Sequence, residues 1–190
     1  MNRILPKKVR LVPKTAIKVF SGEIFDIYQW QQKMYDNSFQ TFEMAKRADT
    51  VQIIGIIEGE VVVLNEEQPD GTVRTYSLPG GRVDIDDKSL LTAAKREMLE
   101  ETGLKFKGWK LLNVYQPESK IEWFVYVFIA WDLSHQSSSS IDVGEKIVVQ
   151  QMSWEKYLQK GRQQTILLNN LSSFLTVSDL IKAQEYSDHI

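Results

Sequence analysis

The segment from Gly80 to Leu104 constrains the fold of this chain more than any other part of the sequence. It reads GGRVDIDDKSLLTAAKREMLEETGL and follows an apparent strand at residues 73–78 and Pro79. Proline restricts the backbone before the turn, and Gly103 supplies the left-handed residue at which helices commonly end. This order predicts a strand, a glycine turn and then a helix that stops at Gly103.

Three glutamates, Glu97, Glu100 and Glu101, lie within five residues of this predicted helix. Residues three and four apart share one face of a helix, and Arg96 precedes Glu100 by four residues, in position to pair with it. Clustered carboxylates are typical of magnesium sites that bridge to substrate phosphates. The alternative is a solvated acidic face. The glycine turn upstream favours a metal site that acts on a polyphosphate.

With these residues the segment resembles the Nudix hydrolases, which cleave nucleoside diphosphates linked to another moiety. The second half of the family's box is matched at every fixed position by residues 96–104. In the first half, Lys88 stands where the pattern has Glu. Counting forward from Gly81 instead puts Asp87 there, which indicates one extra residue in the loop. Because the family's first Glu mainly braces the loop, this departure concerns loop geometry more than chemistry.

The residues and the resemblance together suggest a catalytic site. Glu97 and Glu101 are the expected metal ligands, Glu100 is a third ligand or a bridge through water, and the Gly80 carbonyl is a further ligand. The metal is expected to be Mg²⁺, or Mn²⁺ in its place, and Arg96 would fix the rotamer of Glu100. The resemblance implies a general base on a late loop, where Glu145 matches; the reserve candidates are Glu118 and Glu122.

Several features resemble the ADP-ribose pyrophosphatase branch, namely a β-rich segment before the core and the run Gln116-Pro117-Glu118-Ser119. The branch's Gln-x-Arg stretch and a substrate-binding Glu are replaced here by residues 65–69 and Ser77. The features shared with the branch make ADP-ribose, cleaved to AMP and ribose 5-phosphate, the first expectation. The two departures leave other substrates open. The alternatives are a nucleotide sugar, a dinucleoside polyphosphate or a nucleoside triphosphate, or a module that senses a nucleotide without cleaving it.

Contacts to the diphosphate are expected first from Arg82 and Gly81 beside the turn, and also from Arg47 and Arg74, because arginine suits bidentate phosphate recognition. The alternative, that each is an ordinary surface arginine, is the more common case for this residue type. Aromatic faces for a base, which on strands are more often part of the core, are Trp30, Trp123, Trp131 and Tyr115. His135 and His189 have no partner at metal spacing and receive no role.

Composition narrows the protein class. The 190 residues carry a net charge of −2 and no cysteine, which argues against nucleic-acid binding and excludes thiol chemistry. No apolar stretch approaches the roughly 20 residues of a membrane helix, and an apolar signal sequence is lacking, so a cytoplasmic location is expected. Residues 1–18 carry six cations and no acid. We expect a loose terminus there, with a basic arm that meets an anionic substrate as the alternative.

Alternation and turn residues predict the remaining elements. Hairpins are expected at 23–34 with 39–46, and at 50–57 with 60–65; further strands are expected at 108–115, 121–131 and 146–152, and helices at 154–159 and within about 163–187. The fold class is α/β (α+β): a Nudix-type α/β/α sandwich with a mixed sheet, preceded by an N-terminal β segment. We expect residues 1–48 to form that segment, which could join two copies as a homodimer, and residues 49–190 to form the hydrolase domain.

Overall fold

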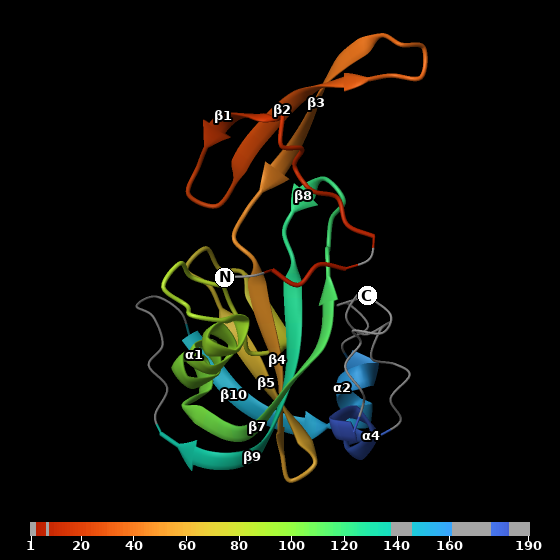
Figure 1. Cartoon of the computed structure of the whole chain (residues 1–190). Helices are drawn as coiled ribbons and strands as arrows, with labels where there is room; N and C mark the ends of the chain where they lie inside the picture. Colours follow the sequence, from red (N-terminus) through yellow and green to blue (C-terminus); the bar gives the residue numbers. More distant parts are fainter. Residues whose placement is uncertain (1–2, 7, 138–145, 161–175, 183–190) are drawn as a thin grey trace.

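The computed structural model describes residues 3–6, 8–137, 146–160 and 176–182. Its elements form a small upper sheet and a larger core (Figure 1). The strands are β1 (Ile17–Ser21), β2 (Asp26–Lys33), β3 (Phe39–Lys46), β4 (Thr50–Ile57), β5 (Glu60–Glu67), β6 (Val73–Ser77), β7 (Leu104–Tyr115), β8 (Ile121–Glu122), β9 (Val125–Gln136) and β10 (Lys146–Ser153). The helices are α1 (Leu90–Thr102), α2 (Trp154–Lys160) and α4 (Val177–Lys182).

The core is a mixed six-stranded sheet in the order β10-β5-β4-β9-β7, with β6 paired to β5. Its centre is the parallel pair β4 and β9, in register from Thr50 with Val125 to Gly55 with Ala130. β4 and the first half of β9, where the two strands pair, are almost entirely buried, as continuous apolar runs covered on two faces should be. Between β4 and β5, Glu58 and Gly59 both have positive φ, which is the geometry of a tight hairpin turn. The second predicted hairpin is thereby confirmed.

Helices cover both faces of this sheet. Alternate residues of a strand point to opposite sides, so Ile53 belongs to the cluster that includes Met98 of α1, and Ile54 to the cluster that includes Trp154 of α2. Leu180 of α4 completes the second cluster. The α/β/α sandwich with a mixed sheet is therefore confirmed.

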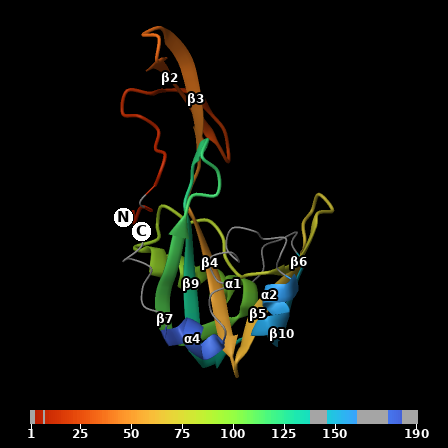
Figure 2. The same ribbon diagram turned by 90° about the vertical axis from the view of Figure 1, so that its right-hand side faces the viewer.

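The N-terminal segment forms a separate four-stranded sheet, β1-β2-β3-β8, which extends away from the core (Figure 2). The hairpin of β2 and β3 is confirmed, and its turn contains Asn37 with φ of 67° and an Asp36 carboxylate that accepts the Ser38 N–H at 2.9 Å. The sequence did not predict β1. All of its five residues are exposed, so it lacks the alternation that marks a half-buried strand.

The strand predicted at residues 121–131 is divided between the two sheets. Residues 121–122 form β8, which pairs in parallel with β3 through Ala45 and Ile121, and β9 begins at Val125 in the core. A continuous apolar run does not reveal where a chain passes from one sheet to another. The chain between β8 and β9 therefore connects the two sheets.

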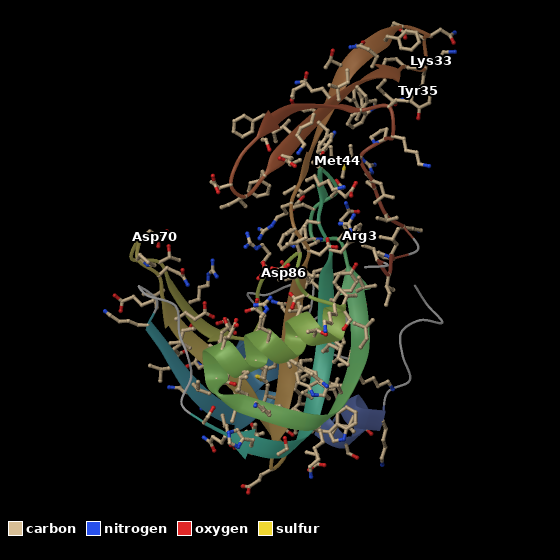
Figure 3. The ribbon with its side chains drawn as sticks, turned by 60° about the vertical axis from the view of Figure 1, so that its left-hand side comes forward. Arg3, Lys33, Tyr35, Met44, Asp70 and Asp86 are labelled. Atoms are coloured by element: carbon tan, nitrogen blue, oxygen red, sulfur yellow. The ribbon has the colours of Figure 1, made fainter. Side chains whose placement is uncertain are left out.

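The N-terminal arm is held against the junction of the two sheets, so the expectation of a loose terminus was wrong for its described part. Arg3 binds Asp49 through two hydrogen bonds of 2.6 and 2.7 Å and Glu122 through one of 2.6 Å. The backbone N–H of Val12 donates to the other Glu122 oxygen at 2.7 Å. Figure 3 shows Arg3 at this junction, far from Lys33 and Tyr35 at the tip of the β2–β3 hairpin.

In the C-terminal part, α2 confirms the helix predicted at 154–159, and the Ser153 hydroxyl accepts the Lys156 N–H at its start. Of the helices expected within 163–187, α4 lies in the described part and the remaining residues outside it. Among the described helices, none has the length and apolar character needed to cross a membrane.

Candidate functional site

Helix α1 has a defined start, end and buried face. The Ser89 hydroxyl accepts the Thr92 N–H at the start, and Gly103 ends the helix with φ of 72° and donates its N–H to the Leu99 carbonyl. Met98 packs over Gly55 of β4, where an added Cβ would lie 2.4 Å from the Met98 methyl group. This close packing fixes the helix on the sheet and determines which of its residues face the glycine turn.

The turn after β6 runs beside β4 and is bonded to β4 at two points and to the residue before it at a third. The N–H groups of Val51 and Ile53 donate to the carbonyls of Gly81 and Pro79, and Val83 donates to the Asp49 carbonyl. Gly80 has φ of 152°, and an added Cβ would lie 2.1 Å from the Val51 carbonyl oxygen. Only glycine fits this position, so the turn is held firmly at the edge of the core sheet.

Two of the three predicted carboxylates contact this turn directly. The Glu101 carboxylate accepts the Gly80 N–H at 2.8 Å. The Glu97 carboxylate lies so close to Gly81 that an added Cβ there would be 2.5 Å from one of its oxygens. Both contacts depend on bare glycine backbone. The structure therefore brings Glu97, Glu101, Gly80 and Gly81 together, as the sequence predicted.

Arg96 connects the third carboxylate to the same cluster. Its Nη1 donates to Glu97 at 2.8 Å and to Glu100 at 3.1 Å, and its Nη2 donates to the Arg82 carbonyl at 2.9 Å. The predicted pairing with Glu100 is confirmed. The Glu100 side chain is 44% exposed, whereas that of Glu97 is 12% exposed, so Glu97 is the deeper of the two.

Asp87 binds the other side of the Arg96 guanidinium. Its carboxylate accepts from Arg96 Nη2 at 2.9 Å and from the Asp84 N–H at 2.9 Å. The hydrogen bond to Arg96 holds the pKa of the buried Asp87 carboxyl below its ordinary value. Asp87 thus connects the loop to the helix. It occupies the position of the first Glu of the box when residues are counted forward from Gly81. The extra residue of the loop is accommodated without losing this bond.

The potential metal ligands around Glu97 fit a hard divalent cation. The carboxylates and the Gly80 carbonyl all offer oxygen atoms, the ligand type that Mg²⁺ prefers. Burial raises the pKa of the Glu97 carboxyl above its ordinary value, against the lowering effect of Arg96, so added positive charge would favour its ionised form. Among the described residues, no three acidic or histidine side chains already converge as a complete metal site. Glu97 and Glu100 would have to reorient from their shared bond to Arg96.

Arg47 contacts the rings of Phe25 and Trp123, with its guanidinium carbon 5.6 and 4.7 Å from their centroids. Its buried Nε has no hydrogen-bond partner among the described residues. Burial, and then the charge of Arg82, lower the pKa of Arg47. A partly buried cation with an unsatisfied donor and a second cation nearby is arranged to receive an anion.

Arg82 lies beside the turn and is mostly exposed, with its Nε bonded to Asp84 at 2.9 Å. Trp123 is oriented by a hydrogen bond from its ring N–H to the Thr50 hydroxyl at 2.9 Å. The sequence named Arg47 and Trp123 separately but gave no reason to place them together. Phe25 was missed as part of this arrangement, because it lies in the connection between β1 and β2 and no local pattern links it to Arg47.

The other sequence candidates lie elsewhere. Glu145 and His189 lie outside the described residues. Glu122 is engaged by Arg3 and Lys46, Glu118 is exposed in a turn, and Arg74 is exposed with Glu66 at 3.8 Å. The remaining aromatic residues pack within the two sheets. Trp30 contacts Phe42, Trp131 packs on the core, and the Tyr115 hydroxyl donates to the Gln52 side chain. His135 is exposed near the end of β9.

A family model and named relatives match this chain. The family model of the NUDIX domain matches residues 46–166. The ADP-ribose pyrophosphatase of Bacillus subtilis is 25% identical over 154 residues, which cover 78% of this chain and 83% of that protein. The ADPR responsive transcriptional repressor NtrR of Acinetobacter baylyi is 31% identical over 87 residues, 45% of this chain and 32% of that protein.

A solved structure titled as that of an ADP compounds hydrolase superposes with a TM-score of 0.67 and 16% sequence identity. The superposition includes 97% of this chain and 100% of that structure's chain. At this identity the match concerns the fold, and it includes the N-terminal sheet as well as the core.

Proposed function

Because the chain belongs to the Nudix family of pyrophosphohydrolases, we propose that it hydrolyses the diphosphate of a nucleoside diphosphate derivative, with ADP-ribose cleaved to AMP and ribose 5-phosphate as the specific reaction. The observation that carries this proposal is the cluster of Glu97, Glu100 and Glu101 around Arg96 and the glycine turn. The ADP-ribose pyrophosphatase of Bacillus subtilis, similar over most of both chains, supports the choice of substrate.

In this proposal Glu97, Glu101, Glu100 and the Gly80 carbonyl hold Mg²⁺, or Mn²⁺ in its place. The metal ion, when bound, neutralises the diphosphate charge, polarises phosphorus and lowers the pKa of a bound water. Arg96 keeps two of the carboxylates on one side of the helix until they bind. Glu145 is proposed as the general base, from its position before β10.

Substrate binding is assigned to the two arginines near the turn and to the bare backbone of Gly81. Arg47 and Arg82 offer donors to the diphosphate, and the unsatisfied Nε of Arg47 is the strongest support for this role. The rings of Phe25 and Trp123, which both contact Arg47, would exclude water from that contact. A guanidinium held in a drier environment makes stronger hydrogen bonds to phosphate.

A nucleotide sensor without hydrolase activity is the second candidate. The resemblance of 87 residues to an ADPR responsive repressor favours it. The complete set of carboxylates in residues 96–104 favours the hydrolase, since a sensor has no need to retain metal ligands. The substrate alternatives within the hydrolase class are nucleotide sugars, dinucleoside polyphosphates and nucleoside triphosphates.

One panel of assays tests the proposal. Purified protein with Mg²⁺ is incubated with ADP-ribose and with each alternative substrate, and phosphate is measured after phosphatase treatment. Glu101→Gln should retain the fold by circular dichroism and lose turnover by about a hundredfold or more, because it removes a charged metal ligand. The matched control is Glu155→Gln, an exposed residue of α2, which should keep the activity. Wild-type turnover in Glu101→Gln would contradict the site, and binding without turnover on every compound would favour the sensor.

The proposal includes a homodimer joined through the N-terminal sheet and a cytoplasmic location. Support for the dimer comes from large apolar side chains that are exposed on this sheet, including Phe20 at 59%, Ile17 at 71% and Phe39 at 62%. Exposed apolar patches of this kind are typical of protein contacts. No membrane or nucleic-acid partner is part of the proposal.

A further inference from the structure

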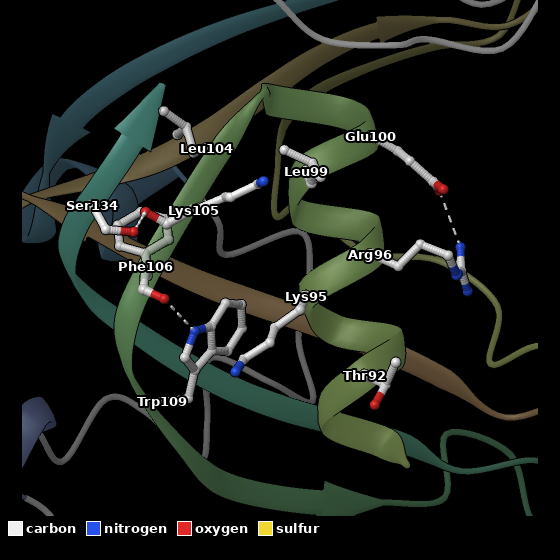
Figure 4. A pocket seen from close by; sticks show the side chains of 10 residues that line it. All are labelled: Thr92, Lys95, Arg96, Leu99, Glu100, Leu104, Lys105, Phe106, Trp109 and Ser134. Atoms are coloured by element: carbon white, nitrogen blue, oxygen red, sulfur yellow. Dashed lines mark hydrogen bonds and ion pairs between the residues drawn. The ribbon is translucent and has the colours of Figure 1, made fainter. Parts of the chain in front are cut away.

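A second cleft lies on the outer side of α1, between this helix and the first half of β7 (Figure 4). Its volume is about 530 Å³. The floor is apolar and consists of Leu99, Leu104, Phe106 and Trp109. The described lining includes no residue of the turn at 79–87, and it shares only Arg96 and Glu100 with the diphosphate site proposed above.

Trp109 is held in a fixed orientation at this floor. Its ring N–H donates to the Phe106 carbonyl at 3.0 Å, as drawn in Figure 4. Its ring also makes edge contacts with Phe106 and Phe128, at centroid distances of 6.3 and 6.5 Å. The group over its face is the Lys95 ammonium, 5.9 Å from the centroid. A half-buried and oriented indole, with an exposed lysine over its face, offers a stacking surface for a planar ring.

The rim of the cleft is positively charged. Lys95 and Lys105 are both exposed, and neither has a carboxylate partner within the ranges that the structure describes. Arg96 and Glu100 also lie at the rim, paired with each other at 3.1 Å, and Arg96 is shared with Glu97 and Asp87, so it adds no free cation there. Two ammonium groups therefore remain without compensation beside an apolar aromatic floor.

We propose that this cleft binds a nucleoside monophosphate, with its base against Trp109 and its phosphate between Lys95 and Lys105. The ligand class follows from complementarity: a flat ring matches the indole, and a doubly charged phosphate matches the two ammonium groups. The volume is within the range of small-molecule sites. A nucleoside monophosphate is also a product of the reaction proposed above, so the cleft would fill as product accumulates; this last point alone rests on the proposed function.

The experiment uses the whole protein labelled with fluorotryptophan. The chain has five tryptophans, and the Trp109 signal is assigned by its loss in Trp109→Phe. Titration with AMP should shift the Trp109 fluorine resonance in a saturable way. The variant Lys95→Ala/Lys105→Ala should weaken the apparent affinity by about tenfold, because two charge contacts to phosphate are lost. The matched control Lys156→Ala, on α2 at the opposite face of the sheet, should bind AMP as the wild type does.

Further arms separate this cleft from the diphosphate site. Arg47→Ala should leave the Trp109 shift unchanged, and neither adenosine nor inorganic phosphate alone should reproduce it at the same concentration. An absent shift, a shift lost in Arg47→Ala, or equal affinity in the double lysine variant would overturn the inference. None of these results affects the hydrolase proposal, whose outcome depends on the separate turnover assay of Glu101→Gln.

Discussion

Arg96 and Arg47 show two different uses of one side chain. Arg96 is surrounded by acceptors, and the hydrogen bond that it donates to Asp87 is the largest of the effects that raise its pKa. Arg47 has aromatic neighbours and an unsatisfied donor, and burial lowers its pKa. The first arginine therefore organises the carboxylates, whereas the second is available to an anion.

The proposed role of Arg47 predicts a kinetic effect. Arg47→Ala should lower kcat/KM by about ten- to a hundredfold, because a charge-assisted hydrogen bond contributes about 1.5–3 kcal/mol. The fold should lose only about 1 kcal/mol of stability, because the contacts with the Phe25 and Trp123 rings are removed but the Nε has no described partner to lose. Steady-state kinetics on ADP-ribose measure the effect. Arg74→Ala, which removes an exposed arginine on β6, is the control, and equal kinetics for both variants would argue against the assignment.

At the level of single residues, the sequence was informative where neighbours on one helix carry the site. The spacing of Glu97, Glu100 and Arg96 is a local property, so their grouping could be predicted. The contact of Phe25 with Arg47, and the bond of Arg3 to Asp49, join residues far apart in the chain. Such contacts depend on the packing of two sheets, which no local pattern encodes.

The turn after β6 is the element on which the site depends most. It is bonded to β4 on one side and contacts Glu97 and Glu101 of α1 on the other. A displacement of this turn would move both contacts at once. The glycine signal in the sequence predicted the turn, but not that it runs along β4.

Substitution in this turn should therefore cost both stability and activity. Gly80→Ala should lower the free energy of unfolding by about 2–4 kcal/mol, because the new methyl group would collide with backbone at a strained φ. Gly59→Ala is the matched control: it also has positive φ, but nothing lies within 4 Å of its added Cβ. It should cost only about 1 kcal/mol. Urea unfolding of both variants measures the difference, and equal losses would contradict the clash.

The docking of the N-terminal arm should depend on pH through Glu122. Burial raises the pKa of Glu122, but the hydrogen bonds from Lys46, Val12 and Arg3 outweigh it and leave the pKa lowered. The resulting stability is present above the unfolded pKa of about 4.3 and is lost as the pH falls through the lower folded value. Wild-type stability should therefore decline in acid more steeply than that of Glu122→Gln.

Unfolding measurements from pH 7 to pH 3 check this expectation. At pH 7 Glu122→Gln should be less stable than the wild type by about 1–3 kcal/mol, and the gap should narrow in acid. Glu118→Gln, an exposed residue of the preceding turn, serves as the control and should show little difference at any pH. A gap that stays constant through the acid range would contradict the role of Glu122 charge.

At the scale of the whole molecule, the core sandwich agreed with the sequence because each core strand carries a continuous or alternating apolar pattern. The smaller sheet agreed only in its hairpin. Its outer strand β1 has no buried face in the single chain, and β8 contains two residues. Both strands are defined by their partners rather than by their own composition.

The exposed face of that smaller sheet predicts self-association. Phe20→Glu should convert a dimer to a monomer at micromolar concentration, because it places a charge among exposed apolar side chains on β1. Sedimentation velocity measures the mass. Val73→Glu changes an equally exposed apolar residue on the distant strand β6 and should leave the mass unchanged. A wild-type monomer, or a dimer that persists in Phe20→Glu, would contradict this contact.

The passage of the chain through β8 on its way to β9 has a consequence for protein engineering and inheritance. The N-terminal sheet includes β8, which comes from the segment that follows β7. Glu122 of this strand forms ion pairs with Arg3 and Lys46 of the N-terminal segment. A graft of residues 1–48 onto a relative would therefore transfer an incomplete sheet. Functional chimaeras should require exchange of residues 116–124 together with the N-terminal segment, and these two stretches of the gene should diverge as one unit.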